Sequence, residues 1–254
     1  MARPVTLFTG QWADLPLETP IPGLPAMRLS TGGNIVSGAA YDAINADMVE
    51  IDVTLTADGQ IVVIHDETLD RTTDGSGRVS DFTRAELQQL DAGGWFAPRF
   101  AGERIPSLDA VLDETEDRIL LNVEINSEAV DRGIVAKVAS AIRRQGMIDQ
   151  VVVSSFSPKG LQEMNSAAPE IWTAVLYNTE FHTDRDPVEI VTHLGASVFN
   201  IKRQRLTKKM RRRCRENNIP IGVYTVNEPR RSARVPSSTI VHRLDATCSP
   251  MRPA

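Results

Sequence analysis

Two carboxylates stand one residue apart in an apolar segment, and a histidine follows the next apolar segment along the chain. Glu50 and Asp52 lie within residues 48–55, and because alternate side chains of a strand share a face, both carboxylates point the same way. A divalent cation bound through oxygen ligands would relieve their repulsion. His65, at the end of the second segment, is a candidate acid or base beside such a cation. Taken alone, the pattern fits equally well a solvated strand face with a histidine at a strand end.

A β-hairpin is predicted to position these residues. Residues 48–55 and 60–64 are two apolar runs, and the pair Asp58-Gly59 lies between them. An Asp-Gly pair between two such runs is typical of a tight hairpin turn. The turn brings the second strand back along the first, so that this strand ends at His65.

Length and composition limit the class of protein. The chain has 254 residues, of which 41% are hydrophobic, and β/α barrels commonly run near ~250 residues as one domain. The net charge of −5 predicts no general affinity for nucleic acid. Cys214 and Cys248 make neither a disulfide framework nor a metal cluster, which favours a reducing compartment. The first 20 residues do not resemble a signal peptide and no apolar run is long enough to span a bilayer, so we expect a cytoplasmic protein without stable membrane insertion.

Apolar strands alternate with amphipathic helices over most of the chain. A first strand is expected at residues 24–29 and a short helix at 39–46. Later strands are expected at 119–125, 151–156, 171–176, 197–201, 219–226 and near Ile240, with helices at 130–145, 159–166, 187–194 and 207–217. Nearly continuous apolar strands separated by helices indicate a parallel sheet covered on both faces. About eight strands in this order predict an α/β fold, a (β/α)8 TIM barrel, in a single domain over residues 1–254.

Residues 66–107 interrupt this alternation and are interpreted as a small inserted subdomain after the second strand. Within it, Thr83 is a natural helix N-cap with Glu86 three residues later as a capping box, and Ser107 caps the helix that follows. A long insertion after a strand is more often functional than inert. Trp95 and Phe96 either wall a substrate pocket or anchor the subdomain.

Chemistry in a TIM barrel takes place at the carboxyl ends of the strands. Glu50 and Asp52 lie near the end of one strand, and Glu124 lies at the end of the next barrel strand. Three carboxylates at one barrel mouth suit a hard cation such as Mg²⁺ or Ca²⁺, which keeps some waters for exchange with a substrate. No cluster of Cys or His at zinc spacing competes with this interpretation. A cation held there would neutralise charge that builds up during displacement at phosphorus.

Six short segments occur in an order and spacing that are specific as a set. They are EIDVTLTADG at 50–59, VIHDETLDRTT at 63–73, GERIPSL at 102–108, LNVEI at 121–125, VSSF at 153–156 and VYTVN at 223–227. In these segments the chain resembles the glycerophosphodiester phosphodiesterase family of metal-dependent TIM-barrel enzymes, over about residues 27 to 250. The resemblance implies that Glu50, Asp52 and Glu124 bind the cation. It also implies that His65 is one of two catalytic histidines and that the substrate is a small phosphodiester.

The chain departs from the family pattern at positions that bear on the reaction. The best register of the first strand puts Met27 where the family has its other catalytic histidine. Arg28, beside it, is kept and could grip a phosphate oxygen. Asn126 stands where the family has a lysine, two residues after the third metal carboxylate. None of the remaining three histidines can replace the missing one by sequence position. We therefore expect an intact metal site with fewer groups for proton transfer and phosphate binding.

Three functions remain open. The leading hypothesis is a phosphodiesterase-like enzyme that acts on a small phosphodiester with a divalent cation, at reduced or altered activity, because removing one partner of an acid/base pair typically costs about 10²–10⁴-fold in rate. The second is a pseudoenzyme, a barrel that binds metal, phosphate or a protein partner without turnover. The third is a lyase or biosynthetic enzyme with a changed substrate on the same scaffold.

The basic run over residues 202–215 suggests a site for nucleic acid or an anionic membrane. Leu206, Met210 and Cys214 recur every fourth residue in it and give the helix an apolar face. The run lacks the interleaved aromatic residues expected of single-strand binding. We interpret it as a barrel helix with a charged outer face, and Arg71 as a structural residue that braces the inserted segment.

Overall fold

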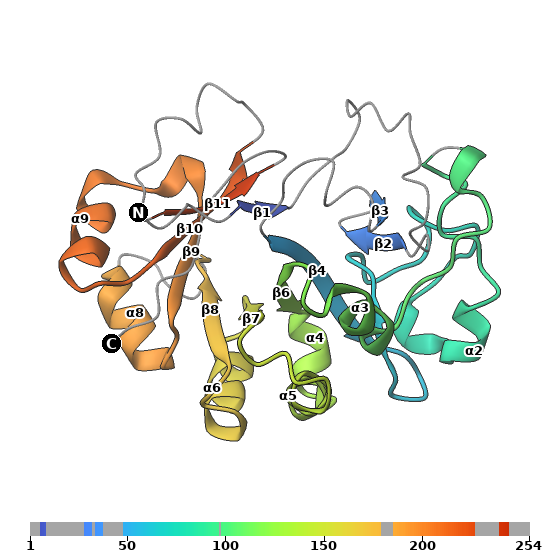
Figure 1. Cartoon of the computed structure of the whole chain (residues 1–254), viewed down its shortest axis with the longest axis horizontal. Helices are drawn as coiled ribbons and strands as arrows, with labels where there is room; N and C mark the ends of the chain where they lie inside the picture. Colours follow the sequence, from blue (N-terminus) through green and yellow to red (C-terminus); the bar gives the residue numbers. More distant parts are fainter. Residues whose placement is uncertain are drawn as a thin grey trace.

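The computed structural model describes residues 6–8, 28–31, 34–37, 48–96, 98–178, 185–226 and 239–243. Within this part, eight parallel strands close into a barrel, in which β1 pairs with β11 on one side and with β4 on the other (Figure 1). In order around the barrel they are β1 (Thr6–Phe8), β4 (Met48–Leu55), β6 (Leu120–Ile125), β7 (Val151–Ser155), β8 (Trp172–Leu176), β9 (Val198–Lys202), β10 (Ile221–Val226) and β11 (Thr239–Arg243). The predicted (β/α)8 TIM barrel is confirmed.

Helices connect the strands and cover the outside of the barrel (Figure 1). They are α3 (Leu108–Thr115), α4 (Ser127–Val130), α5 (Ile134–Arg144), α6 (Pro158–Ala167), α8 (Pro187–Leu194) and α9 (Lys208–Glu216). Two of them begin where local chemistry predicts, because Ser157 and Asp186 each cap a helix whose first residue is a proline. From residue 119 onward, the helices and strands lie within a few residues of the predicted ranges.

The hydrophobic core lies between the strands and the helices. Val49, Ile51 and Val53 of β4 are at most 1% exposed and pack in one cluster with side chains of α3 and α5. Because side chains alternate along a strand, the residues between them, Glu50 and Asp52, point into the barrel. The sequence pattern of β4 thus places its apolar face outward and its carboxylates inward.

The prediction that residues 24–29 form the first barrel strand is wrong. Thr6–Phe8 takes that place between β11 and β4, whereas β2 (Arg28–Thr31) pairs antiparallel with β3 (Asn34–Ser37) in a separate two-stranded sheet. Both segments are short and apolar, so local pattern does not say which one closes the ring. The helix predicted at 39–46 lies outside the described residues.

The predicted hairpin is confirmed. β5 (Ile61–Val63) runs antiparallel to β4, with Leu55 paired to Ile61. Gly59 in the turn has a φ of 72°, in the left-handed region that glycine adopts without strain. The amide of Ile64 then donates to the carbonyl of Asp52 at 3.0 Å. This hydrogen bond to β4 holds the backbone directly before His65 beside the strand that carries the carboxylates.

The inserted segment packs on this hairpin. It contains η1 (Val79–Asp81), α2 (Arg84–Leu87) and η2 (Pro98–Phe100). Its buried apolar side chains form a small cluster with two residues of the hairpin; the members are Val62, Ile64, Leu69, Val79, Leu87, Ala92 and Ile105. The expected capping box is present, since Thr83 and Glu86 bond reciprocally, and Ser107 caps α3. Local capping chemistry therefore starts both helices where the sequence predicts.

Candidate metal centre and active site

Three carboxylates meet inside the barrel mouth. Asp52 of β4 is paired with Glu124 of β6, and Glu50 lies two residues earlier on the same face of β4. Each of the three offers an oxygen, and these oxygens lie within 4.8 Å of one another. The structure thus brings together the three residues predicted as metal ligands, although Glu124 is more than seventy positions away in the chain.

The electrostatics of this cluster are unfavourable without a cation. Glu50 and Asp52 are 5% and 8% exposed. Burial, followed by the neighbouring charges of Asp52 and Glu124, raises the pKa of Glu50 well above its ordinary value. Burial and Asp52 also raise the pKa of Glu124. Carboxylates that repel each other in a low-dielectric site are stabilised in their ionised form by a bound divalent cation.

The surrounding polar atoms fit a hydrated cation. Asn122 is paired with Glu50 across β4 and β6, and Ser154 is paired with Glu124 across β6 and β7. Within the described part of the chain, the amide atoms of Asn122 and the hydroxyl of Ser154 are buried and have no hydrogen-bond partner. Buried polar atoms are normally satisfied by protein or water. An all-oxygen ligand set next to groups that can hold water matches the requirements of hard divalent cations.

His65 belongs to a chain of hydrogen bonds at the rim of the mouth. Its Nδ1 lies 2.6 Å from Oδ1 of Asp66, and Arg71 contacts Oδ2 and Oδ1 of the same carboxylate at 2.6 and 2.7 Å. Hydrogen bonding from Arg71, aided by His65, lowers the pKa of Asp66 to about 2. An ionised carboxylate can only accept, so Nδ1 must donate and Nε2 is left for proton transfer. The imidazole side chain is 54% exposed, so it is accessible to a ligand.

Sequence reasoning missed the role of Asp66 and placed Arg71 only as a brace. The available signal was the spacing of a histidine, the adjacent aspartate and an arginine five residues later. A chain of that kind fixes an imidazole tautomer. Arg71 does hold the segment after β5, and it does so through the carboxylate that orients His65.

Tyr224 is a second residue that sequence reasoning did not assign. It lies on β10, with its ring 6.5 Å from that of Phe156 and its hydroxyl donating to the carbonyl of Tyr177 at 3.5 Å. Burial, and then the charge of Glu124, raises the pKa of the phenol, while Arg205 lowers it. Tyr224 therefore lies inside the mouth, within electrostatic range of the carboxylate cluster.

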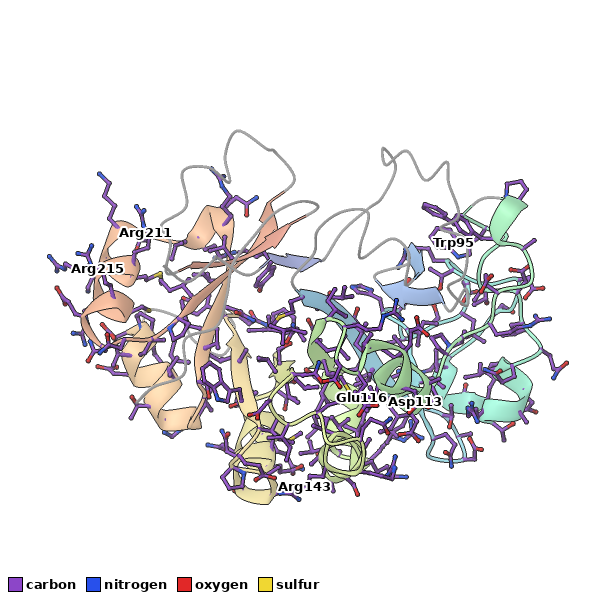
Figure 2. All side chains as sticks on the ribbon, viewed as in Figure 1. Trp95, Asp113, Glu116, Arg143, Arg211 and Arg215 are labelled. Carbon is purple, nitrogen blue, oxygen red and sulfur yellow. The ribbon has the colours of Figure 1, made fainter. Side chains whose placement is uncertain are left out.

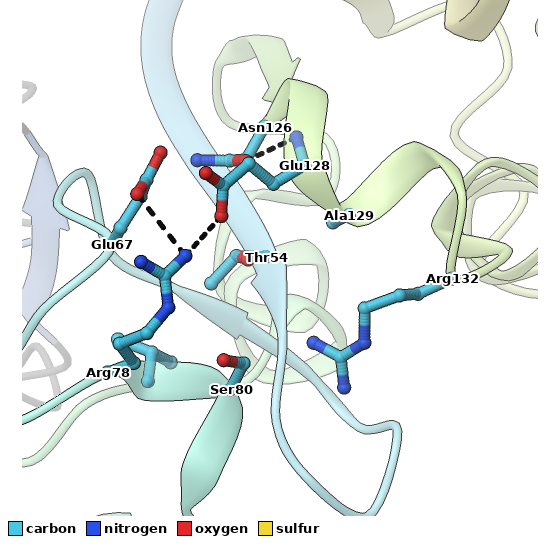
Figure 3. Close-up of a pocket in the computed structure, with 9 residues that line it drawn as sticks. Thr54, Glu67, Arg78, Ser80, Asn126, Glu128, Ala129 and Arg132 are labelled. Carbon is cyan, nitrogen blue, oxygen red and sulfur yellow. Dashed lines mark hydrogen bonds and ion pairs between the residues drawn. The ribbon is translucent and has the colours of Figure 1, made fainter.

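A small pocket of about 70 Å³ adjoins the mouth (Figure 3). It is lined by Thr54, Glu67, Arg78, Val79, Ser80, Asn126, Glu128, Ala129 and Arg132. Three of these residues come two positions after Asp52, His65 and Glu124, so the pocket continues outward from the predicted site. Arg78 pairs with Glu67 and Glu128, and Asn126 caps α4 by accepting from the amide of Glu128 at 2.9 Å. In this chain, the residue at the family's lysine position has a structural role.

Other predicted residues occupy less central positions. Arg28 lies on the β2–β3 sheet rather than on the first barrel strand, which removes the basis on which we assigned it to phosphate; its side chain, like Met27, lies outside the described part. Trp95 donates to the carbonyl of Ala92 at 3.0 Å, and Phe96 packs against the main core, so both contacts anchor the insertion.

The basic helix α9 has the predicted apolar inner face, because Cys214 is buried and Met210 packs on the core; Leu206, which precedes the helix, packs on the same core. Arg211 and Arg215 extend away from the barrel (Figure 2). None of the helices in the described residues has the length and apolar character needed to cross a membrane.

Fold and site together define a class of protein, a TIM barrel with a carboxylate cluster and a rim histidine at its mouth. Residues 39–247 match the model of the glycerophosphoryl diester phosphodiesterase family, and the chain belongs to that family. The Bacillus subtilis protein YhdW is 40% identical over 201 residues, which are 78% of this chain and 82% of YhdW. The glycerophosphodiester phosphodiesterase of Caldanaerobacter subterraneus is 37% identical over 186 residues, covering 72% of this chain and 75% of that protein.

Solved structures agree with this assignment. The crystal structure of a glycerophosphodiester phosphodiesterase from Agrobacterium tumefaciens superposes with a TM-score of 0.70 at 32% sequence identity, over 82% of this chain and 88% of that chain. The likeness extends over most of this chain and most of that enzyme.

Proposed function

We propose that this protein is a metal-dependent phosphodiesterase that acts on small glycerophosphodiesters. The carboxylate cluster of Glu50, Asp52 and Glu124 beside the His65–Asp66–Arg71 chain is the observation that carries the proposal. Oxygen ligands and room for water favour Mg²⁺ or Ca²⁺. When bound, such a cation supplies positive charge to the phosphate oxygens.

The residues of the chain perform the remaining tasks. The three carboxylates hold and orient the cation from two adjacent strands. Asp66, itself held by Arg71, keeps the Nδ1 proton of His65 in place, so that Nε2 takes a proton from the attacking hydroxyl or gives one to the leaving oxygen. The chain has no histidine before His65, so no second histidine comes from a first strand in that region. Hydrolysis is therefore expected to be slower than with two acid/base groups.

A single proton-transfer group also suits ring closure. If a glycerol hydroxyl attacks the adjacent phosphorus, His65 takes its proton and returns it to the departing alcohol, and the product is a cyclic phosphate. Phosphorus NMR of the products from glycerophosphocholine distinguishes the reactions, because hydrolysis gives a glycerol phosphate monoester and ring closure gives the cyclic diester.

The test is an assay of the purified chain with glycerophosphocholine and Mg²⁺ or Ca²⁺, together with calorimetry of metal binding. Turnover that a chelator abolishes, and that His65→Ala lowers while metal binding stays intact, is the expected result. The lack of both turnover and metal binding in the wild-type protein would overturn the proposal and leave the pseudoenzyme as the explanation.

A further inference from the structure

The carboxyl end of β9 lies across the barrel mouth from the carboxylates. In the ring of eight strands, β9 is four strands away from β4 in either direction, which is the opposite wall. The last residue of β9 is Lys202, and η3 (Arg203–Arg205) follows at once. Two cationic side chains, Lys202 and Arg205, are therefore available on the wall that faces Glu50 and Asp52.

The strand register puts Lys202 at the height of Asp52. Paired residues lead from Asp52 through β6, β7 and β8 to Val198. The reverse route, through β1, β11 and β10, leads from Met48 to within about one residue of Lys202, so for Asp52, four residues further along β4, it ends about four residues beyond Lys202. The two routes differ by about eight residues, the shear of a TIM barrel, because tilted strands climb around the ring. The residue of β9 at the same height along the barrel axis as Asp52 lies midway between the end points of the two routes, and that residue is Lys202.

The side chain of Lys202 points toward the interior of the barrel. Phe199 and Ile201 are fully buried in the outer core with residues of α8 and α9, so Asn200 and Lys202 alternate to the inner face. Lys202 is exposed because it stands at the open end of the strand. It is also paired with Tyr224 of β10, the tyrosine of the mouth.

Arg205 lies near the same tyrosine. The helix η3 contacts β10, and the guanidinium of Arg205 acts on the Tyr224 phenol together with the carboxylate of Glu124. Glu124 and Arg205 thus both lie within electrostatic range of the phenol and have opposite effects on its pKa. A group bound between them meets negative charge on the β6 side and positive charge on the β9 side.

Three other cations near the mouth are already engaged. Arg71 is held by Asp66, Arg78 by Glu67 and Glu128, and Arg132 by the carbonyls of Leu55 and Thr56. Within the described residues, neither Lys202 nor Arg205 forms an ion pair with a carboxylate. Three carboxylates and a phosphodiester carry four formal negative charges, of which a divalent cation neutralises two. Lys202 and Arg205 would balance the remainder.

We propose that Lys202 and Arg205 bind the non-bridging phosphate oxygens of the substrate from the wall opposite the metal centre. The inference rests on the proposed function for the identity of the substrate, but phosphate binding can be measured without turnover. On this proposal the basic run over residues 202–215 has two parts. Its first residues bind phosphate at the mouth, and the rest forms the solvated face of α9.

The test compares Lys202→Ala and Arg205→Ala with Arg215→Ala, a matched loss of charge on the outer face of α9. Binding of sn-glycerol 3-phosphate and of inorganic phosphate is measured by calorimetry on the full chain with Mg²⁺, and KM and kcat are measured for glycerophosphocholine. Loss of a charge-assisted hydrogen bond predicts about ten- to a hundredfold weaker phosphate binding and a higher KM for the first two variants. Mg²⁺ affinity and the unfolding midpoint should stay at wild-type values, and Lys202→Arg should retain most of the binding.

The outcomes separate this inference from the proposed function. Phosphate binding that is no weaker in Lys202→Ala and Arg205→Ala than in Arg215→Ala overturns the inference, even if the enzyme is active. A protein that lacks turnover but loses phosphate binding on Lys202→Ala supports the inference and refutes the proposed function. Absence of phosphate binding in the wild-type protein overturns the inference.

Discussion

Asp66 is held at both carboxylate oxygens by Arg71, at 2.6 and 2.7 Å. One of these oxygens also meets Nδ1 of His65 at 2.6 Å. Arg71 thus holds the carboxylate of Asp66 in place, and that carboxylate orients the imidazole of His65. The whole arrangement lies within seven residues of one loop, whereas the metal ligands come from two strands.

Replacing Asp66 with Asn should impair proton transfer without affecting the metal. The Asn amide can donate to Nδ1, which favours the tautomer with the proton on Nε2 and removes the base. We expect kcat to fall about 10²-fold or more, since a wrong tautomer in a related arrangement costs about 10⁴-fold. Steady-state kinetics and metal calorimetry test this. Glu116→Gln, a loss of charge on an exposed residue distant from the mouth, is the control, and equal kcat in both variants would contradict the assignment.

The same contact predicts a pH-dependent contribution to stability. The pKa of Asp66 falls from 3.8 to about 2 on folding, so the folded state favours its ionised form. The contribution is fully present above about pH 4 and is lost as the pH falls toward 2. Solvent screening at the half-exposed Arg71 limits it to about 1 kcal/mol. Urea unfolding between pH 2 and 6 should show wild-type protein and Asp66→Asn converging in stability at the acid end; a constant difference would exclude this linkage.

Glu50→Gln should stabilise the metal-free protein while it weakens metal binding. Burial and the neighbouring carboxylates raise the pKa of Glu50, so the folded state binds its proton more tightly than the unfolded chain. The stability of the metal-free wild-type protein therefore declines as the pH rises above about 4.5, and this decline continues until the raised pKa is passed. Glutamine keeps the shape and removes the charge.

A rise of a few degrees in the unfolding midpoint at pH 7.5 is expected for Glu50→Gln in the presence of a chelator, since 1 kcal/mol corresponds to about 2–4 °C in a domain of this size. Calorimetric scans from pH 5 to 8, with and without Mg²⁺, provide the measurement. If the variant is less stable than the wild-type protein at every pH, burial and charge repulsion among the carboxylates do not destabilise the metal-free protein as inferred.

Asn126→Lys should alter activity and stability in opposite directions. A lysine there adds positive charge beside the mouth, and we expect kcat/KM to rise about tenfold. The change also removes the side-chain cap on the amide of Glu128, at a cost of about 1 kcal/mol. Kinetics and urea unfolding of the same variant separate the two effects. Asn126→Asp keeps the cap without the positive charge, and a matching gain in that variant would rule out the electrostatic explanation.

Local sequence patterns were sufficient for much of the fold. The alternation in β4 puts Glu50 and Asp52 on one face whatever the rest of the chain does, because strand geometry has a period of two. Capping residues such as Thr83 and Ser107 start helices through bonds to amides within three residues. These are short-range effects, so the sequence alone predicts them.

Closure of the barrel was decided by tertiary structure. Whether residues 6–8 or 24–29 form the first strand depends on pairing with β11 and β4, which are distant in the chain. The meeting of Asp52 with Glu124 was expected from the barrel hypothesis, but the position of Lys202 across the mouth from Asp52 depends on the tilt of all the strands between them. The register offsets between neighbouring strands add up around a closed sheet, and their total cannot be predicted from a local pattern of residues. The three carboxylates and His65 could therefore be predicted from the sequence, whereas their spatial arrangement and the opposing charges across the mouth follow from the closed ring.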